Sequence, residues 1–324
     1  MKIYDIAVIG GGSGGVMATL RSVLNNDETI LFPGSPKHNK KSRALWVSKV
    51  ENMPGHLQYK KGIVEPNRES LTWLTTSKMS NKFHWMKNRG IEFIEKNNDV
   101  FRLVDNKGEE YFAKYVILAT GVMDVQPVIG DSIAPILPFA NVQLAEYCLR
   151  CDGHHIIGKD SGVIGHGDGA AWVAIMLFER YSPPSMTIYL NGEDEQFKDR
   201  SRELIKKYGV KVVKDKIKSI QGDPKAGLLE GMFMEDDSFY KVENIFVSLG
   251  MIVYNELALQ LNAKVDDRGF VVGDKWGHTS VENLFVVGDL KADIKNQIYT
   301  AWDSAVDSAD YINNLIRKEK RKLL

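Results

Sequence analysis

The two cysteines of the chain stand close together, in the sequence Cys148-Leu149-Arg150-Cys151. Two cysteines placed at random in a chain of this length would show that spacing roughly 1% of the time or less. Cysteines at this spacing can close a strained, reducible disulfide, and their thiolates can exchange with an external disulfide. If a helix begins here, its dipole would stabilise a thiolate. The spacing therefore predicts a redox-active pair.

Two other interpretations of the cysteines stay open. A structural zinc site needs four ligands, and only His154 and His155 lie nearby in the sequence to supplement the two thiols. Alternatively, both cysteines are buried and inert. We expect no metal site. The two histidines are interpreted as core or interface residues, with proton transfer at the dithiol as an alternative.

A glycine-rich turn near the N-terminus has the pattern of a dinucleotide site. An apolar, β-prone stretch, Ile3–Ile9, precedes it, and a helix-like stretch, Val16–Leu24, follows it. Gly10, Gly12 and Gly15 occupy the first, third and sixth positions of the motif. In this context the backbone can approach a pyrophosphate, which then faces the start of the helix.

A second turn of the same kind occurs later in the chain. It runs Gly165-His166-Gly167-Asp168-Gly169-Ala170, with alanine in the sixth place. A short strand, Ser161–Ile164, precedes it and a buried helix, Ala171–Glu179, is expected after it. Gly165, Gly167 and Ala170 are therefore candidates for binding a second nucleotide.

Strands alternating with helices predict an α/β fold with two Rossmann-like dinucleotide-binding domains, each built on a parallel sheet. Apolar strands ending in glycine, Tyr115–Gly121 and Ile245–Gly250, close the two units. The expected domains are a discontinuous one, residues 1–121 and 244–324, and a second one inserted into it, residues 122–243, which carries the cysteines.

Composition excludes several classes of protein. The chain has 42 basic and 42 acidic side chains, so its formal net charge is zero, and nucleic acid is not expected as a partner. The longest apolar run, Ala170–Phe178, is about half of what a bilayer span requires, so no membrane span is expected. The N-terminus shows no secretory signal pattern, which predicts a cytoplasmic protein.

These motifs together resemble the low-molecular-weight thioredoxin reductases and their relatives. That family has two dinucleotide domains, one inserted in the other, and a Cys-x-x-Cys just before the second glycine turn. The resemblance covers essentially the whole chain and rests on Gly10–Gly15, Val50–Gly55, Ala119–Gly121, Cys148–Gly153, Gly165–Ala170, and Gly288–Asp289 followed by Asn296–Ile298.

The resemblance implies FAD in the first domain. By analogy, the pyrophosphate would lie on the first glycine turn. Asn52 and Ala119–Gly121 would border the flavin, and Gly288–Asp289 would bind oxygens of the ribityl chain and the pyrophosphate. Asn296–Ile298 would cover the edge of the isoalloxazine ring. The implied FAD residues are Gly10, Gly12, Ser13, Gly14, Gly15, Asn52, Ala119, Thr120, Gly121, Gly288, Asp289, Asn296, Gln297 and Ile298.

The resemblance also implies catalytic roles at the cysteines. Cys151 resembles the cysteine next to the flavin, and Cys148 the interchange thiol that meets the partner. Asp152 would protonate the leaving thiolate. The family implies a homodimer and a thioredoxin-like protein or a small disulfide as the partner.

Two departures from the family bear on the cofactors. Pro33 stands where dinucleotide folds usually place an acid for the adenosine ribose. Glu193, Asp194 and Glu195 stand where NADPH-dependent reductases carry arginines for the 2′-phosphate. Like charges oppose the binding of that phosphate, so NADPH is disfavoured. It stays open whether the second turn binds NADH, NADPH or a second flavin.

The departures resemble the divergent thioredoxin-reductase-like flavoproteins. Members of that wider group take electrons from ferredoxin, bind a second flavin, or act as dithiol oxidases that reduce oxygen. We expect an FAD-dependent thiol-disulfide oxidoreductase. A flavin dithiol oxidase and a low-turnover, redox-responsive flavoprotein are the alternatives.

Overall fold

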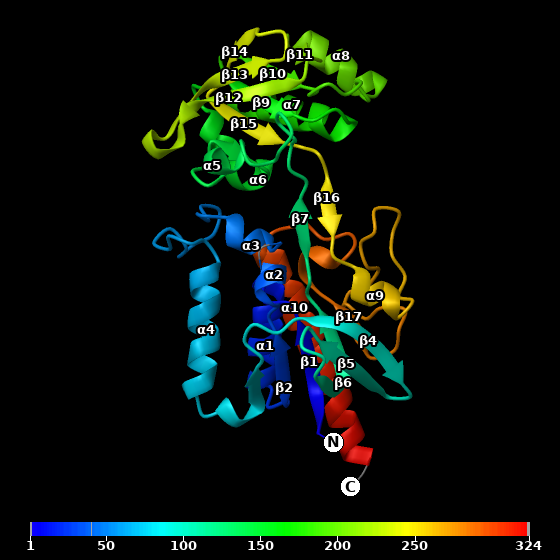
Figure 1. Ribbon diagram of the computed structural model, residues 1–324. Helices are drawn as coiled ribbons and strands as arrows, with labels where there is room; N and C mark the ends of the chain where they lie inside the picture. The colour runs from blue at the N-terminus through cyan, green and yellow to red at the C-terminus, as the bar shows by residue number, and fades with distance from the viewer. Residues whose placement is uncertain (1, 40, 323–324) are drawn as a thin grey trace. The chain divides into compact units, whose positions relative to one another are not determined.

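The computed structural model describes residues 2–39 and 41–322, and it divides into two compact units (Figure 1). Unit 1 takes residues 1–45, 59–123 and 252–324. Unit 2 takes residues 46–58 and 124–251. Both are α/β units built around a sheet with parallel strands, as the alternation of strands and helices predicts.

Unit 1 is built on a seven-stranded sheet in the order β3-β2-β1-β6-β5-β4, with β17 also paired to β6. The strands β1, β2, β3, β6 and β17 run parallel, whereas β5 pairs antiparallel with both of its neighbours, β4 and β6. Their bounds are β1 Ile3–Ile9, β2 Thr29–Phe32, β3 Phe83–Trp85, β4 Ile91–Asn97, β5 Val100–Asp105, β6 Glu110–Leu118 and β17 Leu284–Val286.

Both faces of this sheet are buried, and β1 shows why. Side chains alternate between the two faces of a strand. Ala7 and Ile9 therefore pack into one core, while Ile6 and Val8 pack into the other. All four are nearly or fully buried, which explains the continuous apolar run at this position in the sequence.

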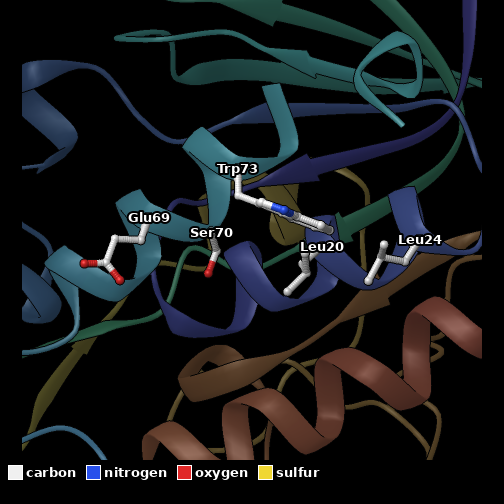
Figure 2. Close-up of a pocket in the computed structure, with 5 residues that line it drawn as sticks. All are labelled: Leu20, Leu24, Glu69, Ser70 and Trp73. Atoms are coloured by element: carbon white, nitrogen blue, oxygen red, sulfur yellow. The ribbon is translucent and has the colours of Figure 1, made fainter. Parts of the chain in front are cut away.

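The helices of unit 1 include two long ones that pack together, α1 and α10. Arg21 of α1 forms an ion pair with Asp310 of α10 at 2.6 Å. Figure 2 shows a shallow hollow between α1 and α4, lined by Leu20, Leu24, Glu69, Ser70 and Trp73. The helices are α1 Ser13–Leu24, α2 Pro36–Asn39, α3 Arg43–Trp46, α4 Val64–Thr76, α9 Glu256–Gln260 and α10 Ile298–Lys322, with short 3₁₀ turns η1 Ser80–Lys82 and η4 Gly288–Leu290.

Unit 2 has a five-stranded parallel sheet in the order β11-β10-β9-β15-β8. Side chains alternate here too: Ile164 packs into one core and Val163 into the other. The strands are β8 Ala145–Glu146, β9 Ser161–Ile164, β10 Met186–Tyr189, β11 Lys211–Val213 and β15 Asn244–Val247.

An antiparallel sheet of three strands and several helices complete unit 2. The strands are β12 Ile217–Asp223, β13 Leu228–Met234 and β14 Phe239–Lys241, and the helices are α5 Leu137–Ala140, α6 Leu149–Asp152, α7 Asp168–Tyr181, α8 Asp199–Lys207, η2 Gly153–Ile156 and η3 Pro224–Ala226. None of the helices in the described residues is long and apolar enough to cross a membrane.

The chain passes between the units four times: at either end of residues 46–58, and on the paired strands β7 (Val122–Asp124) and β16 (Met251–Val253). The crossing on β7 lies after residue 123, two residues from the expected boundary after 121. The crossing on β16 lies after residue 251, whereas the expected inserted domain ends at residue 243. The reason is strand pairing, since β15 pairs with β9 and places Asn244 opposite Ser161. The sequence also did not indicate that residues 46–58 group with unit 2.

Candidate active site

The first glycine turn of unit 1 is shaped by close backbone packing. Gly10 has a φ of +121°, and a Cβ there would lie 2.2 Å from the carbonyl oxygen of Ala119. A Cβ on Gly15 would lie 1.9 Å from the carbonyl oxygen of Gly10. A Cβ on Gly12, by contrast, would meet nothing within 4 Å. Gly12 is the N-cap of α1 and no side chain caps this helix, so its start can accept an anion such as a pyrophosphate.

Two other predicted motifs lie at the same edge of the sheet. The Ala119 amide donates to Ile9 at 2.8 Å, and the Val287 amide donates to Leu118 at 3.0 Å, so the ends of β1, β6 and β17 meet. Ser13 and Gly14 begin α1, and a Cβ on Gly14 would lie 3.4 Å from the Cα of Gly288. Ligands of open α/β sheets bind at such carboxyl ends.

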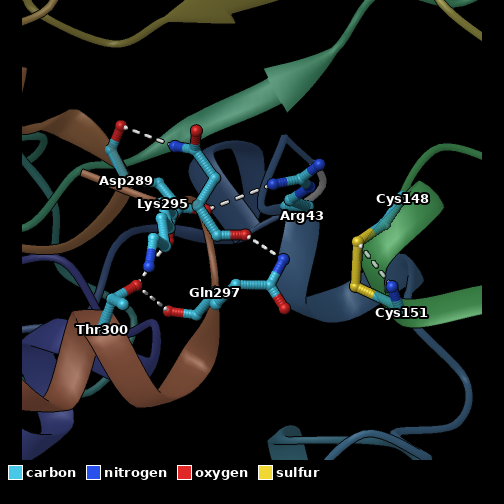
Figure 3. The surroundings of a disulfide bond; sticks show 8 residues. Arg43, Cys148, Cys151, Asp289, Lys295, Gln297 and Thr300 are labelled. Atoms are coloured by element: carbon cyan, nitrogen blue, oxygen red, sulfur yellow. Dashed lines mark hydrogen bonds and ion pairs between the residues drawn. A yellow bond between two sulfur atoms is a disulfide. The ribbon is translucent and has the colours of Figure 1, made fainter. Parts of the chain in front are cut away.

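The side chains near this edge include one cation that the sequence did not single out. Arg43 lies 3.3 Å from the carboxylate of Asp289 (Figure 3). The Asn296 amide donates to the Asp289 carbonyl at 3.3 Å. A lone arginine in a polar stretch gives no signal in the sequence, because only the fold brings it to Asp289.

The remaining predicted FAD residues lie in different settings. Thr120 donates its hydroxyl to the Tyr254 carbonyl at 2.6 Å, so the hydroxyl holds the loop. Gln297 is buried and donates to the Asn296 carbonyl at 2.9 Å, and Ile298 begins α10. Gly121 has a φ of +71° and open space where a Cβ would stand. Asn52 lies in the segment 46–58 of unit 2, so it is not among the residues that unit 1 brings together.

The second glycine turn, in unit 2, is also shaped by close backbone packing. A Cβ on Gly165 would lie 2.4 Å from the Ser248 carbonyl oxygen and 2.7 Å from the Cβ of Ala170. A Cβ on Gly167, the N-cap of α7, would meet nothing within 4 Å, and no side chain caps this helix. Nδ1 of His166 is buried and has no hydrogen-bond partner among the described residues. This turn too can accept an anionic group at a helix start.

The acidic segment after β10 lies next to this second turn. The Gln196 amide donates to the His166 carbonyl at 2.9 Å, which ties the segment to the turn. Asp194 pairs with Lys214 at 2.6 Å, and Glu195 pairs with Arg202 at 2.7 Å. The two nearby cations are thus already paired with carboxylates and would have to exchange partners to bind a phosphate.

Cys148 and Cys151 form a disulfide with a Cα–Cα distance of 5.3 Å (Figure 3). Sulfur atoms bonded to each other are not zinc thiolates, so this state does not fit a zinc site. Cys148 is the N-cap of α6, and its Sγ accepts a hydrogen bond from the Cys151 amide at 3.2 Å. The expected support from a helix dipole is weak, because α6 has four residues and ends at Asp152. The hydrogen bond from the Cys151 amide to the Cys148 Sγ provides local support instead.

Asp152 lies beside the disulfide. Its carboxylate and the two sulfur atoms all lie within 4.8 Å of one another. Burial, and then the charge of Glu146, raises the pKa of Asp152 to about 7. A carboxyl with such a pKa is available in its neutral form near neutral pH, as a proton donor to a thiolate must be.

A group of histidines and carboxylates surrounds Asp152. Nδ1 of His155 lies 2.5 Å from Glu146, and Nε2 of His155 lies 2.9 Å from Glu51. Nε2 of His154 lies 2.9 Å from the same Glu51 oxygen. The sequence did not assign a role to either carboxylate: Glu51 stands within the Val50–Gly55 motif, and Glu146 is a lone acid in an apolar strand.

Comparison with known proteins identifies the family. The sequence model described as pyridine nucleotide-disulphide oxidoreductase matches residues 4–309. The chain belongs to this family. Within it, the oxidoreductase is a divergent, thioredoxin reductase-like member.

Its relatives include the thioredoxin reductase of Mycoplasmopsis pulmonis, which is 24% identical over 98% of this chain and 99% of that protein. The thioredoxin reductase of Listeria monocytogenes is 25% identical over 93% and 90%. The oxidoreductase shares its fold with the thioredoxin reductase of Streptococcus pyogenes, at a TM-score of 0.82, 21% identity and coverage of 98% and 99%. The enzyme from Giardia duodenalis has a TM-score of 0.81 at 19% identity, with coverage of 98% and 100%.

Proposed function

We propose that this oxidoreductase is an FAD-dependent thiol-disulfide oxidoreductase. It passes electrons between a flavin, the Cys148–Cys151 disulfide and a disulfide of a protein or a small molecule. The observation that carries this function is the disulfide with the Asp152 carboxyl within 4.8 Å of both sulfur atoms. That arrangement supplies the two thiols and the proton donor that thiol-disulfide exchange requires.

FAD fits the first glycine turn of unit 1. Gly12 leaves open space at an uncapped helix start, while Gly10 and Gly15 admit no side chain. The pyrophosphate would lie there, and the implied contacts from Ala119–Gly121, Gly288–Asp289 and Asn296–Ile298 lie at or near the same sheet edge. When bound, FAD supplies two-electron exchange with the disulfide.

Different residues of unit 2 would then carry out the successive steps of thiol-disulfide exchange. Reduction of the disulfide takes two electrons and two protons and yields two thiols. The Cys148 thiolate, which accepts a hydrogen bond from the Cys151 amide, attacks the partner's disulfide and releases one thiolate. Cys151 then attacks the sulfur of Cys148 in the mixed disulfide and releases the partner's second thiol. Neutral Asp152 gives a proton to the leaving thiolate.

The partner of this chemistry is a thioredoxin-like protein or a small disulfide, since the curated relatives are named thioredoxin reductases. We extend the homodimer of that family to this chain as part of the same proposal. Thiol-based turnover suits a reducing compartment such as the cytoplasm.

An anaerobic titration with dithionite tests the function. The protein as purified should carry FAD and should consume four electrons per flavin, two for the flavin and two for Cys148–Cys151. The absorption spectrum of the flavin and alkylation of the thiols followed by mass spectrometry report the two events separately. Consumption of only two electrons, with both cysteines still protected from alkylation, would contradict the proposed function.

The acidic segment beside the second turn predicts the choice of electron donor. Carboxylates at this position suit a ribose 2′-hydroxyl and oppose a 2′-phosphate. We therefore expect NADPH to reduce the bound flavin about tenfold more slowly than NADH at equal concentration. Stopped-flow measurement of flavin bleaching under anaerobic conditions checks this.

A charge-reversed variant is the control for the donor experiment. Glu193→Lys should narrow the difference between the rates at which NADPH and NADH reduce the flavin, because it replaces a negative charge by a positive one at the first acid of the segment. A wild-type protein that prefers NADPH would contradict the prediction. Bleaching by neither nucleotide would assign the electrons to another class of donor, such as a ferredoxin-type protein.

A further inference from the structure

A continuous group of titratable side chains leads away from the disulfide. The carboxylate of Asp152 lies within 4.8 Å of both sulfur atoms, and also within 4.8 Å of the nearest ligand atoms of His155 and Glu146. Such separations can be spanned by one hydrogen-bonded water. Asp152 therefore belongs both to the group around the sulfur atoms and to the group around the imidazole of His155.

His155 is held at both of its ring nitrogens. Glu146, which is 3% exposed, lies 2.5 Å from Nδ1, and Glu51 lies 2.9 Å from Nε2. An imidazole between two carboxylates is fixed in orientation, and its charged form is favoured. His154, with a side chain that is 46% exposed, reaches the same Glu51 oxygen at 2.9 Å. The group thus extends from a buried carboxylate to the protein surface.

The contacts within this group shift the pKa values of its members. The hydrogen bond to Glu146 raises the pKa of His155 to about 9. The hydrogen bond from His155 lowers the pKa of Glu51 to about 2. Burial raises the pKa of Glu146. At neutral pH, His155 therefore carries a proton beside Asp152, whose pKa is about 7.

We propose that His155, clamped by Glu146 and Glu51, is the positioning residue that returns a proton to Asp152 after Asp152 has protonated the leaving thiolate. The inference rests on the proposed function and deepens it, since it assigns the proton path of the same site. His155 touches neither sulfur atom in this role and acts through Asp152.

The steps balance without a further reactant. The two electrons come from the reductant of the disulfide, which is reduced flavin in turnover or an added dithiol in the test. Neutral Asp152 transfers its proton to the leaving thiolate and becomes a carboxylate. The His155 imidazolium then transfers its proton to Asp152 and becomes neutral. Solvent protonates His155 again at the part of its own side chain that is exposed.

The charges that face His155 come from several elements. Glu146 lies on β8, Asp152 on α6 and His154 on η2, while Glu51 lies in the segment 46–58. Beyond these, Lys49 pairs with Glu51 at 3.0 Å, and the charge of Lys159 acts on Glu146. The acids next to His155 favour its proton, and the two lysines act on the acids rather than on the imidazole directly.

The test compares rate constants for reduction of the disulfide by dithiothreitol in the full-length, flavin-loaded protein, with alkylation of the released thiols as the readout. The ratio of variant to wild type is taken at each pH from 5 to 10, so that the ionisation of dithiothreitol cancels. For His155→Gln we expect a ratio of about 0.1 or less between about pH 7 and 9, where Asp152 needs a proton returned to it and His155 still carries one. The ratio should approach one at pH 5, where Asp152 stays neutral, and at pH 10, where His155 has lost its proton.

Glu146→Gln keeps an acceptor for Nδ1 but removes the charge, so it should lower the pKa of His155. Its ratio should stay near one at pH 6 and fall between pH 7 and 9, where only the wild type still holds the proton on His155.

His154→Gln is the matched control, because His154 shares Glu51 with His155 but has no contact with Glu146. Its ratio should remain near one throughout. NMR titration of isotope-labelled histidine in wild type and Glu146→Gln measures the same change without using a rate.

Three results would overturn the inference. These are a pH-independent ratio near one for His155→Gln, an unchanged titration of His155 in Glu146→Gln, or a stoichiometric divalent metal at Glu51, His154 and His155 in the purified protein, since a metal would displace the proton. The proposed function fails on a different result, namely a wild-type disulfide that dithionite and dithiothreitol leave intact.

Discussion

Replacing Cys151 by serine should leave FAD bound and reduce disulfide turnover by about 1,000-fold or more, as expected when a nucleophile is removed. The variant retains Cys148, whose thiolate can still attack a partner's disulfide. It lacks the second thiol that resolves the mixed disulfide. Turnover is measured with a small disulfide substrate, and bound flavin by absorption. Persistence of full activity would contradict the function itself.

The companion variant Cys148→Ser separates the roles of the two cysteines. Cys151→Ser should accumulate a mixed disulfide between Cys148 and the substrate, visible by mass spectrometry as a covalent adduct. Cys148→Ser should lose turnover to the same extent but accumulate no adduct. An adduct that forms in Cys148→Ser and not in Cys151→Ser would reverse the assignment of interchange thiol and flavin-side thiol.

Gly15→Ala should destabilise unit 1 by at least about 3 kcal/mol and abolish flavin binding. The methyl group would lie 1.9 Å from the carbonyl oxygen of Gly10, a backbone atom in the turn between β1 and α1. Because no flexible side chain can move aside, the strand and the helix would have to separate. Thermal unfolding of the flavin-free protein and the flavin content after purification are the measurements.

Gly12→Ala is the matched control for Gly15→Ala. Gly12 has a φ of −77°, which alanine adopts readily, and a Cβ would meet nothing within 4 Å. Stability of the flavin-free protein should change by less than about 1 kcal/mol. Affinity for FAD should fall by about tenfold or more, because the methyl group enters the space through which the backbone meets a pyrophosphate. Equal flavin affinity in Gly12→Ala and wild type would place the pyrophosphate elsewhere.

Local patterns in the sequence predicted the local parts of the fold. The strands Ile3–Ile9 and Ser161–Ile164 have the predicted bounds, because each is a short apolar run that ends at a glycine turn. The glycines of both turns could be found from their spacing between a strand and a helix, although the backbone that packs against Gly10 and Gly165 comes from Ala119 and Ser248, far away in the sequence. The spacing of Cys148 and Cys151 predicted a redox pair, with a zinc site and two inert thiols as alternatives, and the structure has a disulfide between them.

The surroundings of the disulfide were not predictable in the same way. Glu51 lies about 100 residues from His155 in the sequence, and no local pattern joins them. Glu146 lies closer, but a single acid in a short strand gives no sign that its side chain is buried against an imidazole. The sequence does not show where β15 belongs for a related reason, because its partner is a strand more than 80 residues earlier. Long-range pairing decides such features.

The insertion of unit 2 has a consequence for the order of folding during synthesis. All strands of the five-stranded sheet of unit 2 have been made once residue 247 has emerged, so this sheet can form while translation continues. The sheet of unit 1 still lacks β17 at that point, and Ile312 and Ile316 of α10, which belong to its core, come later still. The unit that begins the chain is therefore the one completed last, and its first strands must wait, with apolar faces uncovered, for a helix made at the end.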